Sequence, residues 1–150
     1  MTQNINEYLW GDLKVGLSSS FPVKVTEEMM ENFLTYSRDH NPIHVDKSYA
    51  EKYGFQDRVV HGLLVAAFYS TLVGMYLPGK HSFLHGINVS FLKPVFVDDE
   101  LIIVGKITYL NNAYKQVEIR GEIKNQNGKK VSRAKIKVGM LGLSHGEENE

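Results

Sequence analysis

Residues 62–76 read GLLVAAFYSTLVGMY, an apolar stretch that Pro78 and Gly79 bring to an end. Apolar residues occur on nearly every side of a helix drawn through this stretch, which predicts a long central helix surrounded by other structure. The stretch is shorter than the roughly 20 residues that a bilayer-spanning helix needs, so we expect a buried core helix and no membrane association.

The chain after this helix has the pattern of a β-sheet. Four segments are rich in β-branched and aromatic residues with partial alternation, and two of the turns between them contain Asn. The predicted strands are 83–91, 101–110, 115–125 and 130–141. A short extended segment, 21–25, precedes all of them, and the polar residues 142–150 are expected to form a frayed tail.

Two further helices are predicted before the central one. Thr26 can cap a helix that runs to about Arg38, and Asp46 can cap a short helix over 47–53. Helices therefore come first and a run of antiparallel strands follows, which indicates the α+β class. We expect one domain over residues 1–150, with the central helix packed on an antiparallel sheet.

The composition excludes several classes of function. Among 150 residues, Lys and Arg total 17 and Asp and Glu total 17, so the formal net charge is +0. A neutral chain without a basic block argues against nucleic-acid binding. The chain has no cysteine, which excludes disulfides, thiol nucleophiles and Cys-ligated metals. With no secretory signal over residues 1–7, this composition leads us to expect a cytoplasmic protein.

Residues 39–44 carry the side chains best suited to acid–base chemistry. Pro42 disfavours helical geometry at Asn41, so Asp39 and His44 lie on either side of a turn and can converge on one site. Histidine exchanges a proton near neutral pH, because its ordinary pKa is about 6.5. An aspartate can hold a water, orient an imidazole or act as an acid. Asn41 can supply a fixed amide to the loop or to the ligand.

Gly62 adds a main-chain group to this set. A glycine at a helix start lets a ligand approach the backbone, and its free N–H stabilises negative charge on a carbonyl oxygen. Together with Asp39 and His44, it provides an acid, a base and an oxyanion donor. These are parts needed to add or remove water next to a thioester.

Each of these residues also has a purely structural interpretation. Alone, Asp39 would be a turn residue and His44 a hydrogen-bonded structural histidine. Their combination with Asn41 and Gly62 favours the functional interpretation, with His61 supporting the loop rather than reacting. His40 and His44 have the spacing of a helical metal pair, but Pro42 lies between them, so we expect no metal site.

The segments 39–44 (DHNPIH), 61–64 (HGLL), 77–80 (LPGK) and 91–100 (FLKPVFVDDE) together resemble the MaoC-like (R)-specific enoyl-CoA hydratases. The resemblance covers most of residues 20–141. It implies a hot-dog fold, in which an antiparallel sheet wraps the central helix. It also implies a homodimer with paired sheets and a ligand tunnel near the dimer interface.

The resemblance also implies residue roles. Asp39 and His44 would be the catalytic pair, the Gly62 N–H would be the oxyanion donor, and Asn41 and Ser70 would support the site. Family members often have glycine just before the catalytic aspartate, where this chain has Arg38. The implied reaction is reversible addition of water to a trans-2-enoyl-CoA, giving an (R)-3-hydroxyacyl-CoA. No cofactor is implied; coenzyme A or phosphopantetheine would serve only as the acyl carrier of the substrate.

Three other functions stay open on the sequence. The same chemistry could act on acyl carrier protein, as a 3-hydroxyacyl dehydratase in fatty-acid or polyketide synthesis. The chain could be a non-catalytic thioester-binding subunit, although the intact Asp39 and His44 pair argues against it. Thioester hydrolysis is the third. The acyl chain length, and which of Asp39 and His44 is the base, are also left open.

Overall fold

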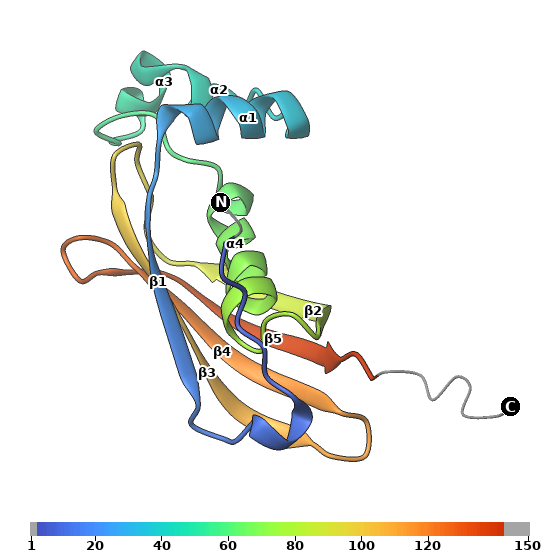
Figure 1. Cartoon of the computed structure of the whole chain (residues 1–150). Coiled ribbons are helices and arrows are strands. Elements are labelled where there is room, and N and C mark those ends of the chain that lie inside the picture. Colours follow the sequence, from blue (N-terminus) through green and yellow to red (C-terminus); the bar gives the residue numbers. More distant parts are fainter. Residues whose placement is uncertain (1–2, 143–150) are drawn as a thin grey trace, which may run out of the picture.

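A computed structural model describes residues 3–142, which form one sheet, a helix packed on one face of it and further helices beyond one end (Figure 1). Of the tail expected over 142–150, only Gly142 lies within the described residues. The elements, in chain order, are η1 (Trp10–Asp12), β1 (Ser18–Lys24), α1 (Glu27–Ser37), α2 (Pro42–Val45), α3 (Lys47–Lys52), α4 (Gly62–Thr71), η2 (Leu72–Tyr76), β2 (Ser82–Phe91), β3 (Glu100–Asn111), β4 (Gln116–Lys124) and β5 (Lys130–Met140).

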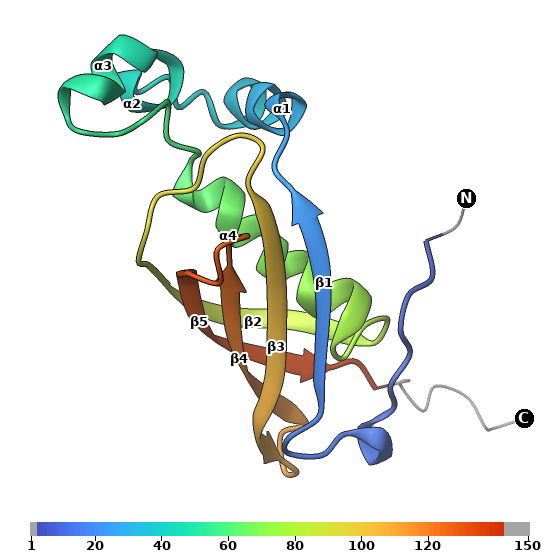
Figure 2. The ribbon, with the colours of Figure 1, turned by 90° about the vertical axis from the view of Figure 1, so that its left-hand side faces the viewer.

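The five strands form one antiparallel sheet in the order β1-β3-β4-β5-β2. β1 and β2 are therefore the two edges. Helix α4 crosses one face of the sheet, and α1, α2 and α3 lie together beyond one end of it (Figures 1 and 2). The α+β class and the antiparallel sheet packed on a central helix are confirmed.

The core forms between α4 and the sheet. Gly105 and Gly121 allow the close approach, since a Cβ at these positions would lie 2.7 Å from Leu72 Cδ2 and 2.6 Å from Tyr69 Cε1. The buried Tyr69 hydroxyl donates to Ser132 Oγ at 3.0 Å, and the Ser132 hydroxyl donates in turn to the Ser90 carbonyl at 3.0 Å. Burial raises the pKa of Tyr69 to about 12, so the hydroxyl stays a donor.

The central helix differs from the sequence prediction in two ways. Only Gly62–Thr71 is α-helical, and Leu72–Tyr76 continues as a π-helical turn. Within this one chain the helix is covered on one side, because Leu63, Ala67 and Ser70 on the other side are exposed. One copy of the sheet therefore leaves part of the apolar surface of the helix uncovered.

The predicted helix caps before the central helix are present. Thr26 Oγ1 accepts the Met29 N–H at 3.2 Å at the start of α1, and Asp46 Oδ1 accepts the Tyr49 N–H at 3.1 Å at the start of α3. Arg38 ends α1 in the left-handed region, with φ of +58°. Over residues 3–142, the structure contains no helix with the length and apolarity needed to cross a membrane.

Candidate active site

The turn from Asp39 to Asn41 is held by side-chain hydrogen bonds. Asp39 Oδ1 accepts the Asn41 N–H at 3.2 Å, and Asn41 Oδ1 accepts the Ile43 N–H at 3.1 Å. Asn41 is thus the N-cap of α2, whose first residue is Pro42. The amide of Asn41 stabilises the loop, and one oxygen of the Asp39 carboxylate is anchored while the other is left available.

His44 faces that available oxygen. Its Nδ1 lies 2.6 Å from the Val59 carbonyl, which can only accept, so Nδ1 carries the hydrogen. In the neutral ring Nε2 therefore bears a lone pair, and Nε2 lies 3.8 Å from Asp39 Oδ2. This distance is too long for a direct hydrogen bond, but both atoms can contact one water placed beside the line that joins them.

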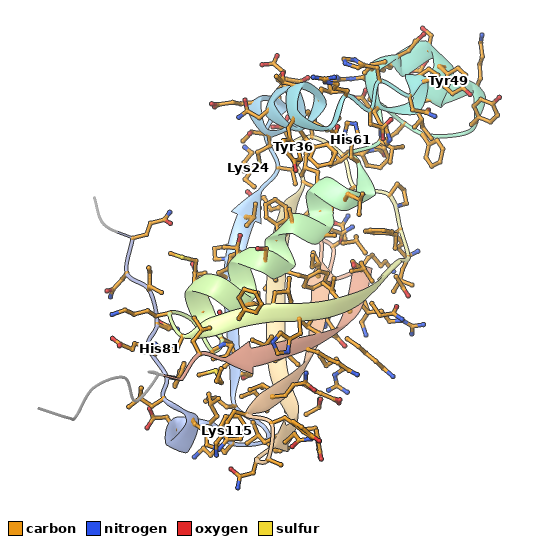
Figure 3. The ribbon with its side chains drawn as sticks, turned by 90° about the vertical axis from the view of Figure 1, so that its right-hand side faces the viewer. Lys24, Tyr36, Tyr49, His61, His81 and Lys115 are labelled. Carbon is orange, nitrogen blue, oxygen red and sulfur yellow. The ribbon has the colours of Figure 1, made fainter. Side chains whose placement is uncertain are left out.

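His61 directly precedes α4 and lies below the layer of α1–α3 (Figure 3). Its side chain is buried, its Nε2 lies 3.0 Å from the Asp39 carbonyl, and its ring stacks on the His44 ring with centroids 3.8 Å apart. Burial lowers the pKa of His61, because it penalises the charged form. The sequence indicated only a loop support here. The position of His61 directly before Gly62 was the sequence feature that could have suggested a role in the site.

Gly62 is the first residue of α4, and the ring of Phe91 packs against it. A Cβ at Gly62 would lie 3.2 Å from two atoms of that ring. A residue at this helix position has no intrahelical acceptor for its N–H, and no hydrogen bond in residues 3–142 uses this amide as donor. The N–H is thus free to bind an oxygen of a ligand.

A cavity of about 410 Å³ joins His44 to Gly62. Apart from these two and Lys93, its walls are apolar, as an acyl chain requires. The remaining lining residues are Phe55, Val59, Val60, Val65, Phe91, Leu92, Pro94, Val95 and Val131. Asp39 is not part of the wall. Its half-exposed carboxylate lies beside His44, which does line the cavity.

Ser70 is not brought to this cavity. It lies eight residues beyond Gly62 on α4, which is about 12 Å along the helix axis at 1.5 Å per residue. It is exposed on the side of α4 that the sheet does not cover. Within a single chain, Asp39, Asn41, His44 and Gly62 therefore gather at one place, and Ser70 lies apart from them.

Asp39, His44 and His61 each offer a ligand atom, and these atoms lie within 4.8 Å of one another. The two imidazoles are stacked with 24° between their planes. Ring lone pairs lie in the ring plane, so those of two nearly parallel rings do not converge on a single ion. His44 and His61 each also use one nitrogen for a main-chain carbonyl. This arrangement suits a hydrogen-bonded pair better than a metal centre.

A family model described as a MaoC-like domain matches residues 14–137. The chain belongs to the MaoC-like family. The resemblance inferred from the sequence is thereby confirmed. Because the matched range includes Asp39, His44 and Gly62, the candidate site lies inside the MaoC-like domain.

Individual MaoC-like relatives agree with this assignment. The (R)-specific enoyl-CoA hydratase of Aeromonas caviae is 34% identical over 116 residues, which cover 77% of this chain and 87% of that protein. The solved structure of the A. caviae (R)-hydratase involved in PHA biosynthesis matches with a TM-score of 0.81 and 31% identity, over 85% of this chain and 97% of that chain. The hot-dog fold is therefore confirmed.

A carrier-protein enzyme also belongs to this group of relatives. The mitochondrial 3-hydroxyacyl-(acyl-carrier-protein) dehydratase of Arabidopsis thaliana is 31% identical over 77 residues. The match covers 51% of this chain and 45% of that protein.

Proposed function

We propose that this chain is an (R)-specific enoyl-CoA hydratase, a hydro-lyase that adds water reversibly to a trans-2-enoyl-CoA. The observation that carries the proposal is the separation of 3.8 Å between His44 Nε2 and Asp39 Oδ2, next to an apolar cavity that reaches the amide of Gly62. The hydratase relative in Aeromonas caviae supports the same reaction.

The proposed reaction uses each group once. A water lies between Asp39 and His44, and one of the two groups takes a proton from it as its oxygen forms a bond to C3 of the enoyl chain. The π-electrons of the C2–C3 bond move toward the thioester carbonyl, whose oxygen accepts a hydrogen bond from the Gly62 N–H. The Asp39 and His44 pair then gives a proton to C2 on the same face, which completes the 3-hydroxyacyl thioester and returns the pair to its starting state. Asp39 and His44 act as a coupled pair.

The proposed enzyme works without a metal or redox cofactor. Water supplies both groups that add across the double bond, a hydrogen and a hydroxyl. The reaction is therefore neither a net oxidation nor a net reduction. Coenzyme A enters only as the acyl carrier of the substrate. Lys93 lines the cavity and is exposed, so its charge is available to a phosphate of that carrier.

We also propose a homodimer. Edge strand β2 carries exposed apolar side chains, with Phe83 58%, Ile87 41% and Phe91 49% exposed, and Leu63 of α4 is 69% exposed. An uncovered edge strand with large apolar side chains is a site of strand pairing. A second copy that paired its own β2 at this edge would extend the sheet and cover the open side of α4.

The alternative is the same chemistry on acyl carrier protein, which the Arabidopsis relative supports. Turnover of crotonyl-CoA and of crotonyl-carrier protein, followed by loss of enoyl absorbance, separates the two. The proposal expects the higher kcat/KM with crotonyl-CoA and an (R)-3-hydroxybutyryl product. Release of free thiol without hydration would instead indicate a thioesterase. The cytoplasmic location stays a prediction, which cell fractionation tests.

A further inference from the structure

His61 is the residue that connects the three parts of the candidate site. It directly precedes Gly62 in the chain, its Nε2 lies 3.0 Å from the Asp39 carbonyl, and its ring stacks on that of His44. Phe33 of α1 also packs against it, with ring centroids 4.7 Å apart. No other side chain in residues 3–142 is both stacked on His44 and hydrogen-bonded to Asp39.

We propose that His61 is a positioning residue, which sets the spacing between Asp39, His44 and the Gly62 amide. This inference rests on the proposed function of the site. His61 itself does not line the cavity, so it acts on the substrate only through its neighbours.

The hydrogen bonding of His61 fixes its form. Because the Asp39 carbonyl only accepts, Nε2 carries the hydrogen and Nδ1 bears the lone pair of a neutral ring. Nδ1 is buried, and it has no hydrogen-bond partner in the part of the chain that the structure describes. A proton on Nδ1 would create a buried donor without an acceptor, which is costly.

A neutral His61 also suits the chemistry of His44. The titratable groups that act on His61 are His44 of α2 and the loop residues Asp39 and His40. A positive charge on His61, with its ring centroid 3.8 Å from that of His44, would oppose protonation of His44. The neutral ring stacks without that repulsion, so His44 remains able to exchange a proton with the water or with the substrate.

Two substitutions separate the two contacts. His61→Gln keeps an amide donor that can reach the Asp39 carbonyl but has no ring to stack. His61→Phe keeps a ring of similar shape but has no donor. His81→Gln is the matched control, because His81 is hydrogen-bonded to Glu7 at 2.9 Å and lies outside the site.

The experiment measures kcat and KM for crotonyl-CoA in these variants, with folding checked by circular dichroism. Displacing reacting groups by about 1 Å lowers turnover by about 100-fold, so we expect kcat to fall by about 10- to 100-fold in both His61 variants. KM should stay within about twofold, because the cavity wall is unchanged. His81→Gln should retain the parent values. Folded His61 variants with the parent kcat would overturn the proposal.

A second measurement does not depend on turnover. In the parent protein at about pH 7, NMR should show a neutral His61 ring with the hydrogen on Nε2. The His44 Nδ1–H signal should shift or broaden in His61→Gln. A His61 ring with hydrogens on both nitrogens at that pH, or an unchanged His44 signal, would reject the positioning role. If the parent failed to hydrate any enoyl thioester, the proposed function would fail, and these signals would still decide the role of His61.

Discussion

The rings of His44 and His61 stack with their centroids 3.8 Å apart, yet they donate to two different main-chain carbonyls, those of Val59 and Asp39. Each carbonyl selects one tautomer of its ring, so the two histidines take different forms. His44 presents a lone pair toward the Asp39 carboxylate, whereas the lone pair of His61 is buried. In this stack, His44 is therefore able to exchange protons, whereas His61 holds His44 in place.

The buried neutral state of His61 predicts a pH dependence of stability. Since burial lowers its pKa in the folded protein, the unfolded chain binds more protons near pH 6.5 and below. The free energy of unfolding should therefore decrease as the pH falls from about 7 to about 5. Chemical denaturation of the parent and of His61→Phe measures this, and the decrease should be smaller in the variant.

Glu7 and Glu122 do not account for a decrease in that window. Hydrogen bonds from His81 to Glu7 and from Lys130 to Glu122 lower the pKa of each carboxyl below its usual 4.5. Their stabilising contribution is therefore lost only below about pH 4.5. Equal pH dependence in parent and His61→Phe would contradict a buried neutral His61.

Gly62→Ala should damage the site by steric contact. The added Cβ would lie 3.2 Å from the Phe91 ring, so the ring must shift by a few tenths of an ångström. Because Phe91 is 49% exposed and not held in a packed core, we expect a cost of up to about 1 kcal/mol in the free energy of unfolding. The main-chain N–H is retained, but the displaced ring narrows the cavity and kcat/KM for crotonyl-CoA should fall. Gly11→Ala is the control, since its Cβ would meet nothing within 4 Å. Equal free energies of unfolding for both variants would show that the Phe91 ring moves aside at no measurable cost.

Arg38→Gly should stabilise the fold. Arg38 has φ of +58°, a left-handed conformation that a residue with a Cβ adopts at a cost of about 1–2 kcal/mol. Glycine adopts it readily but loses more chain entropy on folding, so we expect a net gain of about 0.5–1 kcal/mol in the free energy of unfolding. Tyr36→Gly, at an exposed α-helical position, should do the opposite. A destabilised Arg38→Gly protein would mean that a contact of the Arg38 side chain stabilises the fold by more than its left-handed backbone conformation costs.

Ile87→Lys tests the proposed dimer. Ile87 lies on edge strand β2, where a charge would oppose pairing with a second copy. Sedimentation velocity should show a dimer for the parent and a monomer for the variant, with lower turnover because the tunnel is expected near the interface. Ile102→Lys is the control. Ile102 is similarly exposed, but it lies on β3, which has strands on both sides. A monomeric parent would refute the dimer.

The sequence predicted those features that depend on neighbouring residues. The caps at Thr26 and Asp46 and the turn at Pro42 act over a few positions, so the helix limits and the approach of Asp39 to His44 followed from local geometry. The strands followed from alternation and β-branched content. The family resemblance then supplied the way in which the sheet and central helix combine.

Other features depend on packing between distant segments, which a single sequence does not determine. The His61 bond to Asp39 joins residues 22 positions apart, and the His44 bond to Val59 joins residues 15 apart. The Phe91 contact with Gly62 also depends on how β2 lies against α4. The position of Ser70, about 12 Å from Gly62 along α4, would have followed from the helical rise alone.

The most direct test of the proposed mechanism is the hydration of crotonyl-CoA by the parent protein, Asp39→Asn and His44→Ala, with His40→Ala as a control in the same loop. Loss of an acid–base group costs about 100- to 10,000-fold in rate. We therefore expect parent activity, a loss of at least this size in folded Asp39→Asn and His44→Ala, and a near-parent rate in His40→Ala. Folded Asp39→Asn or His44→Ala protein that hydrates crotonyl-CoA at the parent rate would contradict the assignment of these two residues as the catalytic pair.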